Sequence, residues 1–245
     1  EQPTSNGLST HRQLGVRCWM LDVGCFSLNR MSHTDLSLPS IEAAPQRPTQ
    51  LVLIRHGEVE AAYQRVFGGR IDMNLSPRGH EQAAALAKWL ARQPLNAVYA
   101  SPMKRVQQTF APFGTTNGWA SRAVTLPNLR EVDFGDWTGL TWDAVREKFG
   151  VSAFQWLTEL ERGGIANAEN ATSYRNRLEP FIRETLQKHS GENVAVFCHG
   201  GVIRMILAIL LDIPLPRMAG FEIDYASVTN VAVLPQKTEV QFLNF

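Results

Sequence analysis

The chain has 245 residues, 44% of them hydrophobic, and carries 24 Lys plus Arg against 23 Asp plus Glu. That length is sufficient for a substantial hydrophobic core, and one α/β domain is the simplest arrangement that fits it. The balanced charge argues against a nucleic acid or an anionic membrane surface as a partner, so any cationic site must be local.

Residues 1–48 differ in composition from the rest of the chain. They are rich in Ser, Thr, Asn, Pro and Gln, and they show no hydrophobic periodicity. They also lack the basic, apolar and small-residue layout of a secretory signal. We therefore predict that residues 1–48 are a disordered leader or one derived from the expression vector, and that residues 49–245 form a single domain.

From residue 51 onward, short apolar runs alternate with helical patterns. The expected strands are 51–54, 97–100 and 194–198, and the helices that follow them are 77–92, 102–113 and 202–211. This alternation predicts a sheet with parallel strands and helices on both faces. Further helices are expected between 142 and 189, one of them over 173–188, and a polar connection at 163–170 is a candidate cover for a site. Residues 227–234 and 239–245 are expected to form a hairpin at the sheet edge.

The apolar and cysteine patterns exclude several other classes of protein. The longest apolar stretch, 202–215, contains Arg204 and Asp212 and is shorter than the roughly 20 residues needed to cross a bilayer. The three cysteines form no CxxC pair, and the histidines show no metal-ligand spacing. We therefore expect no membrane span, no metal and no disulfide framework, and we expect a reducing, cytoplasmic compartment.

Unusual polar residues follow three of the predicted strands. Arg55 and His56 follow the first, and Ser101-Pro102 follow the second, where we expect Ser101 to cap a helix that begins at Pro102 and carries Arg105. His199, with Gly200 and Gly201, follows the third. Ligands of open α/β sheets collect at the carboxyl ends of strands, so these residues predict one cationic, phosphate-binding crevice.

The residue types suggest phosphoryl transfer. A neutral imidazole at His56 can attack phosphorus, while Arg55, Arg105 and a protonated His199 hold the oxygens of the transferring group. The product is a phosphohistidine, and the departing alkoxide needs a proton from a carboxylic acid placed opposite the nucleophile. Water then attacks the phosphohistidine, with the same carboxylate as its base.

Four segments resemble the histidine phosphatase superfamily, also called the phosphoglycerate mutase-like family: LVLIRHGE, SPMKR, LREVDFGDWTG and FCHGGVIR, in the family's order over roughly residues 50–245. The resemblance implies a three-layer α/β/α sandwich around a mostly parallel sheet, with no cofactor. It makes His56 the phosphorylated nucleophile, Arg55 and Arg105 the phosphate clamp, His199 the second histidine and Glu131 the proton donor. Glu58, Asp133 and Asp136 remain rival carboxylates.

The chain departs from the family pattern at several positions. Ala62 stands where many members carry a phosphate-binding asparagine, and Glu169 lies in NAEN where many have Gly-Glu-Ser. These departures affect the expected fit of the substrate more than the expected phosphoryl chemistry. Arg65 and Arg70 are candidates to contact a second anionic group on the substrate, or else solvated surface residues.

Three functions follow from the resemblance. The residues after His199 and the LREVDFGDWTG segment favour a phosphatase acting on a small-molecule phosphate ester over a bisphosphoglycerate-dependent mutase. A non-catalytic phospho-ligand or protein-binding module is the remaining alternative, and the retention of His56 and His199 argues against it. The physiological substrate and the oligomeric state do not follow from the sequence.

Overall fold

A computed structural model describes residues 47–245. The predicted leader, residues 1–48, therefore lies outside the described residues except for its last two residues. The described part is built on a six-stranded mixed sheet of order β3-β2-β4-β1-β5-β6. Neighbours from β3 to β1 are parallel, whereas β5 and β6 are antiparallel. The strands are β1 (Thr49–Arg55), β2 (Ala97–Ala100), β3 (Val124–Thr125), β4 (Asn193–Cys198), β5 (Val228–Val233) and β6 (Thr238–Phe242).

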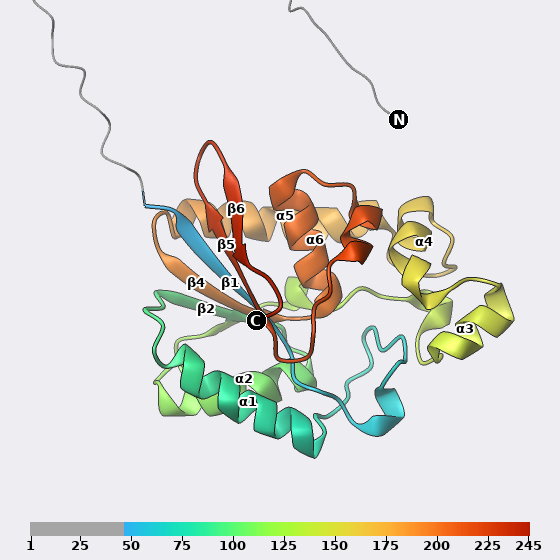
Figure 1. The fold of residues 1–245 in the computed structure, drawn as a ribbon, viewed down its shortest axis with the longest axis horizontal. Helices are drawn as coiled ribbons and strands as arrows, with labels where there is room; N and C mark the ends of the chain where they lie inside the picture. The colour runs from blue at the N-terminus through green and yellow to red at the C-terminus, as the bar shows by residue number, and fades with distance from the viewer. Residues whose placement is uncertain (1–46) are drawn as a thin grey trace, which may run out of the picture. The chain divides into compact units, whose positions relative to one another are not determined.

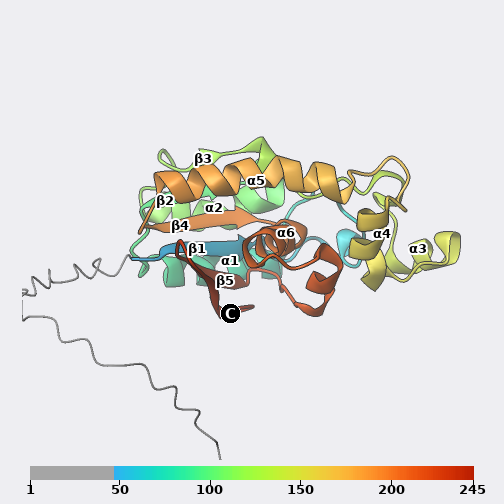
Figure 2. The ribbon, with the colours of Figure 1, turned by 90° about the horizontal axis from the view of Figure 1, so that it is seen from above.

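Helices cover both faces of this sheet. Figure 1 shows α1 (Pro77–Leu90) and α2 (Lys104–Thr116) on one face and α5 (Ala171–Lys188) and α6 (Gly200–Leu211) on the other. Figure 2 shows α3 (Trp142–Phe149) and α4 (Trp156–Arg162) beyond the ends of the strands. The expected α/β/α sandwich with a mostly parallel sheet and an edge hairpin is thus confirmed.

The apolar run of β1 explains how the sheet holds two cores. Leu51 and Leu53 belong to the core that includes α5 and α6, and Val52 and Ile54 to the core that includes α1 and α2. Side chains alternate between the faces of a strand, so a strand covered on both faces needs apolar residues at every position. The register pairs Arg55 with Cys198 and Ala100 with Phe197, which brings the carboxyl ends of β1, β4 and β2 to one edge.

Three helix starts differ from the prediction, and one of them is that of α5, which begins at Ala171 rather than at residue 173. Helix α2 begins at Lys104, not Pro102, and Ser101 is not its cap, because the Lys104 N–H donates instead to Asp72 Oδ1 at 2.7 Å. Helix α6 begins at Gly200, two residues before the expected start. Within residues 47–245, no helix has both the length and the apolar character needed to cross a membrane.

Candidate active site

A cavity of about 500 Å³ opens at the carboxyl ends of β1 and β4. It gathers six of the predicted site residues, namely Arg55, His56, Arg105, Glu131, Gly200 and Gly201. The seventh, His199, lies against His56 with the ring centroids 5.3 Å apart and is itself fully buried. The strand ends therefore meet at one site, as the sequence predicts.

His56 directly follows β1, and its tautomer is set by the backbone. Its Nδ1 lies 2.8 Å from the Gly57 carbonyl oxygen, which can only accept, so Nδ1 carries the proton and Nε2 keeps a lone pair. The Arg105 Nε–H donates to that Nε2 at 3.2 Å. Burial, followed by the charges of Arg105 and Arg55, lowers the pKa of His56 well below 6.5. The imidazole is thus neutral, with its reactive nitrogen directed at the clamp.

The turn after His56 is held by close packing against α1 and α2. The Gly57 N–H donates to Thr109 Oγ1 at 2.9 Å, and a Cβ on Gly57 would lie 2.8 Å from the Gly79 carbonyl oxygen. Only glycine permits this approach of two backbones. The Ser76 hydroxyl caps α1 at the same place by accepting from the Gly79 N–H at 3.0 Å.

The two clamp arginines are held by backbone carbonyls. Arg105 donates from Nη1 to Ile71 at 2.8 Å and from Nη2 to Gly69 at 2.9 Å. Arg55 donates from Nη1 to the Ile223 carbonyl, and its Nε is buried without a protein partner within the described residues. Both guanidiniums are therefore oriented before any anion binds.

His199 is held from the side of β2. Its Nε2 lies 2.9 Å from Ser101 Oγ, so the serine predicted to cap a helix instead orients a histidine. Its Nδ1 is buried with no partner among residues 47–245. Burial and the nearby Arg105, His56 and Arg55 lower the pKa of His199 well below 6.5. Without a bound anion the neutral form of His199 is favoured, because burial and the neighbouring cations disfavour a further positive charge. The protonated His199 expected with a bound phosphoryl group stays a prediction.

Glu131 receives three hydrogen bonds at the cavity. Its carboxylate accepts from the Val132 N–H at 3.0 Å, from the Gly201 N–H at 3.1 Å and from the Tyr174 hydroxyl at 3.2 Å. A Cβ on Gly201 would overlap Glu131 Oε1, so α6 needs a glycine there to leave room for the carboxylate. The backbone N–H of Gly201, a predicted substrate-binding residue, is thus used by Glu131.

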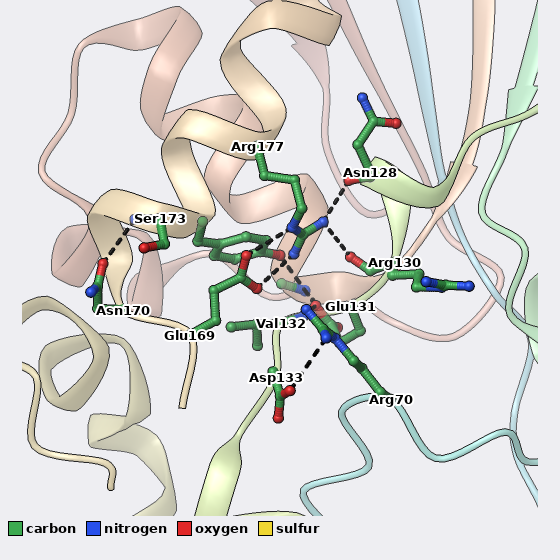
Figure 3. Close-up of polar contacts among 12 residues, drawn as sticks. Arg70, Asn128, Arg130, Glu131, Val132, Asp133, Glu169, Asn170, Ser173 and Arg177 are labelled. Carbon is green, nitrogen blue, oxygen red and sulfur yellow. Dashed lines mark hydrogen bonds and ion pairs between the residues drawn. The ribbon is translucent and has the colours of Figure 1, made fainter. Parts of the chain in front are cut away.

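Tyr174 and Arg177 support Glu131 from α5, and the sequence reasoning missed both. Tyr174 is fully buried, and burial raises the pKa of its hydroxyl well above 10, so the hydroxyl keeps its proton and donates. Figure 3 shows Arg177 reaching Glu169 and the carbonyls of Asn128 and Arg130. The Arg177 guanidinium also lies 4.8 Å from the Tyr174 ring centroid. No sequence signal identifies this ion pair, because Glu169 precedes α5 and the two residues are not three or four positions apart on one helix.

The rival carboxylates have other partners and do not line the cavity. Glu58 accepts from the Ser76 hydroxyl at 2.7 Å, at the start of α1. Asp133 accepts from the Gly135 N–H at 3.0 Å and pairs with Arg70 at 3.4 Å, as Figure 3 shows. Asp136 accepts from Asn167 at 2.8 Å. Glu131 is thus the one of these four carboxylates that reaches the cavity.

Arg65 and Arg70 lie away from the predicted second anion. The Arg65 guanidinium lies 5.3 Å from the Trp142 ring centroid, and Arg70 pairs with Asp133. Neither lines the cavity, so their contact with substrate stays a prediction without geometric support. Ala62 is exposed on a short 3₁₀ helix and likewise does not line it. The polar connection at 163–170 does not cover the cavity either.

Residues 219–225 form one wall of the cavity, which the sequence reasoning also missed. The Arg55 guanidinium lies 4.0 Å from the Tyr225 ring centroid, within cation–π range. Asp224 is fixed by Asn244, whose Nδ2 donates to Asp224 Oδ2 at 2.8 Å and whose Oδ1 accepts from the Asp224 N–H. The wall is thus attached both to the clamp and to the residues after β6.

Comparison with known proteins gives a consistent result. The model of the histidine phosphatase superfamily (branch 1) matches residues 51–245. A metal-independent phosphoserine phosphatase of Arabidopsis thaliana is 34% identical over 77% of this chain and 78% of that protein. Phosphoserine phosphatase 1 of Hydrogenobacter thermophilus is 28% identical over 80% of this chain and 92% of that protein.

Among solved structures, the chain resembles a mycobacterial glucosyl-3-phosphoglycerate phosphatase. The TM-score is 0.71 at 22% identity, covering 81% of this chain and 99% of that one. At this identity the likeness shows a shared fold.

Proposed function

We propose that this chain, which belongs to the histidine phosphatase superfamily (branch 1), hydrolyses a small phosphorylated metabolite by transferring its phosphoryl group to His56. The chain is a phosphoric monoester hydrolase, and the phosphatase names of its relatives agree with this class. The observation that carries the assignment of His56 is its tautomer: Nδ1–H is bonded to Gly57, which leaves the Nε2 lone pair beside Arg105.

In the first step, His56 Nε2 forms a bond to phosphorus as the bond from phosphorus to the ester oxygen breaks. Arg105 and Arg55 supply positive charge to the oxygens of the transferring group, at a site where burial strengthens that interaction. The buried Nδ1 of His199 and Nε of Arg55, which have no protein partner within residues 47–245, are the donors available to those oxygens. A phosphate dianion would also favour the protonated form of His199 that the protein alone disfavours.

Glu131 is the proposed acid and base. Protonated, it gives its proton to the departing alkoxide; ionised, it takes a proton from the water that then attacks the phosphohistidine. The second step releases phosphate, returns His56 to its starting form and restores the proton to Glu131.

The other functions expected from the sequence gain no support. The relatives described above are named as phosphatases, and no contact in the described residues favours the mutase. The binding-module alternative would leave unexplained a neutral, oriented His56 beside two arginines. The proposed partner remains a small-molecule phosphate ester. A cytoplasmic location stays a prediction. Cys198 is a free, buried thiol.

The test is to incubate the enzyme with a ³²P-labelled phosphomonoester, quench the reaction in alkali or in acid, and measure the label bound covalently to the protein. We expect an alkali-stable, acid-labile label in the wild-type protein and in His80→Ala, which alters an exposed histidine on α1. We expect no label in His56→Ala. A labelled phosphohistidine that persists in His56→Ala would contradict the assignment.

A further inference from the structure

The outer part of the cavity is lined by aromatic rings. Five of them come from the segments between β1 and α4, and we call them the aromatic wall: Phe67, Phe134, Trp142, Phe154 and Trp156. They contact one another in edge-to-face or tilted pairs, with Phe67 and Phe134 centroids 5.0 Å apart and Trp142 and Phe154 centroids 5.6 Å apart. The wall therefore offers ring faces and edges to whatever is esterified to the phosphate.

Phe154 is the most unusual member of the wall. Its surface is 75% exposed, although it is a large apolar residue at the mouth of a deep cavity. An exposed aromatic ring on a pocket rim gains stability only when a ligand covers it. Its neighbours in the wall are more deeply buried, so Phe154 contributes the open face.

A second part of the cavity lining is acidic. Glu222 and Asp224, from the wall at 219–225, are both exposed and line the cavity. Glu222 forms no ion pair with any residue in 47–245. A second anionic group on a substrate would meet these carboxylates at the mouth, where like charges repel.

Three arginines line the cavity, and Arg204 is the one not assigned to the phosphoryl group. Arg105 and Arg55 serve the phosphoryl group, and Arg204 donates to the Gly200 carbonyl at 3.3 Å and to the Phe221 carbonyl at 2.9 Å. Arg65 and Arg70, the candidates for a second anion, lie on Trp142 and Asp133 instead. Among the residues that line the cavity, Arg55, Arg105 and Arg204 are matched in number by Glu131, Glu222 and Asp224, so the lining offers no net positive charge to a second anionic group.

We infer that the substrate is the phosphomonoester of an alcohol that carries an aromatic ring and has no second anionic group. This inference rests on the proposed function and narrows its substrate class. The ring packs on the aromatic wall beneath Phe154, while the phosphate reaches His56. It also distinguishes this cavity from what a carboxylate-bearing ester without an ammonium group, such as 3-phosphoglycerate, would require.

The test compares three alkyl phosphates with similar leaving groups: 2-phenylethyl phosphate, ethyl phosphate and 3-phosphoglycerate. We expect kcat/KM of the wild-type protein for 2-phenylethyl phosphate to exceed that for either other ester by roughly tenfold or more, equal to about 1.4 kcal/mol. Phe154→Ala should lower this preference several-fold. Phe245→Ala, which alters an aromatic residue of similar exposure outside the cavity, should retain it.

A charge reversal tests the acidic side independently. Glu222→Lys should raise kcat/KM for 3-phosphoglycerate relative to 2-phenylethyl phosphate by about tenfold. Equal or better hydrolysis of 3-phosphoglycerate by the wild-type protein would overturn the inference, as would an unchanged preference in Phe154→Ala. If even para-nitrophenyl phosphate is not hydrolysed, the proposed function itself fails. Hydrolysis of all three esters at similar rates would instead contradict only the inference about the substrate class.

Discussion

Replacing Gly201 by Ala separates the stability of the fold from the position of the proposed acid. The new methyl group would overlap Glu131 Oε1 and lie 3.1 Å from Glu131 Cδ, closer than the roughly 3.5–4.0 Å of an ordinary carbon contact. The obstacles are side-chain atoms, and the third of them is Trp156 Cη2 at 3.2 Å. Glu131 can retreat by roughly 0.5–1 Å and lose the bond from the Gly201 N–H. Alanine also favours helix by up to about 1 kcal/mol over glycine.

We therefore expect a folded Gly201→Ala protein whose free energy of unfolding changes by about 1 kcal/mol or less. A misplacement of about 1 Å at a reacting group can cost roughly 100-fold in rate, or about 2.7 kcal/mol. That loss should appear in kcat for an alkyl phosphate, whose leaving group needs a proton. It should be much smaller for para-nitrophenyl phosphate, whose leaving group does not.

The assay is a double-mutant cycle with Glu131→Ala, measured on both substrates. In the Glu131→Ala background the carboxylate is gone, so adding Gly201→Ala should change kcat little. A further 100-fold loss in that background would show that Gly201 acts by another route. Equal losses on the alkyl and aryl esters would refute the reasoning as well.

Two other predictions concern the groups around the phosphate site. Tyr174→Phe removes the hydroxyl that donates to Glu131, so kcat for alkyl phosphates should fall about tenfold while para-nitrophenyl phosphate is affected less; a purely structural role for Tyr174 would lower both alike. The lowered pKa values of His56 and His199 mean that below pH 6.5 the unfolded chain binds protons that the folded protein does not. The free energy of unfolding should therefore fall as the pH drops from 6.5 toward the folded-state pKa values, by up to about 2.7 kcal/mol per pH unit for the two groups together. Urea titrations between neutral pH and pH 5 measure this, and His199→Asn should make the decline shallower; a slope that the substitution leaves unchanged would contradict the assignment.

The sequence predicts the parts of the site that depend on strand ends. His56 and His199 follow apolar runs, and parallel strands put such positions on one edge, so their meeting required only the order of elements. The resemblance to a known family supplied Glu131, which no periodicity identifies.

The parts that were missed depend on burial and on contacts between distant segments. Ser101 satisfies the local rule for a helix cap, yet its hydroxyl bonds to His199, 98 residues away. At the start of α2, the Lys104 N–H donates to Asp72 instead. The sequence also does not reveal that the His199 ring is fully buried, which disfavours its protonation until an anion is bound. Tyr174 resembles an ordinary core residue of α5 until its hydroxyl is placed beside Glu131, 43 residues earlier.

The bond between Asn244 and Asp224 makes the two ends of the described chain unequal as attachment points. Thr49 is the first residue of β1, at the end of the strand remote from the cavity, whereas Asn244 contacts a cavity wall directly. A fluorophore or affinity handle joined after Phe245 would consequently sense, and disturb, the occupancy of the cavity. A position after Phe245 is therefore better suited to reporting substrate binding than to immobilising the protein.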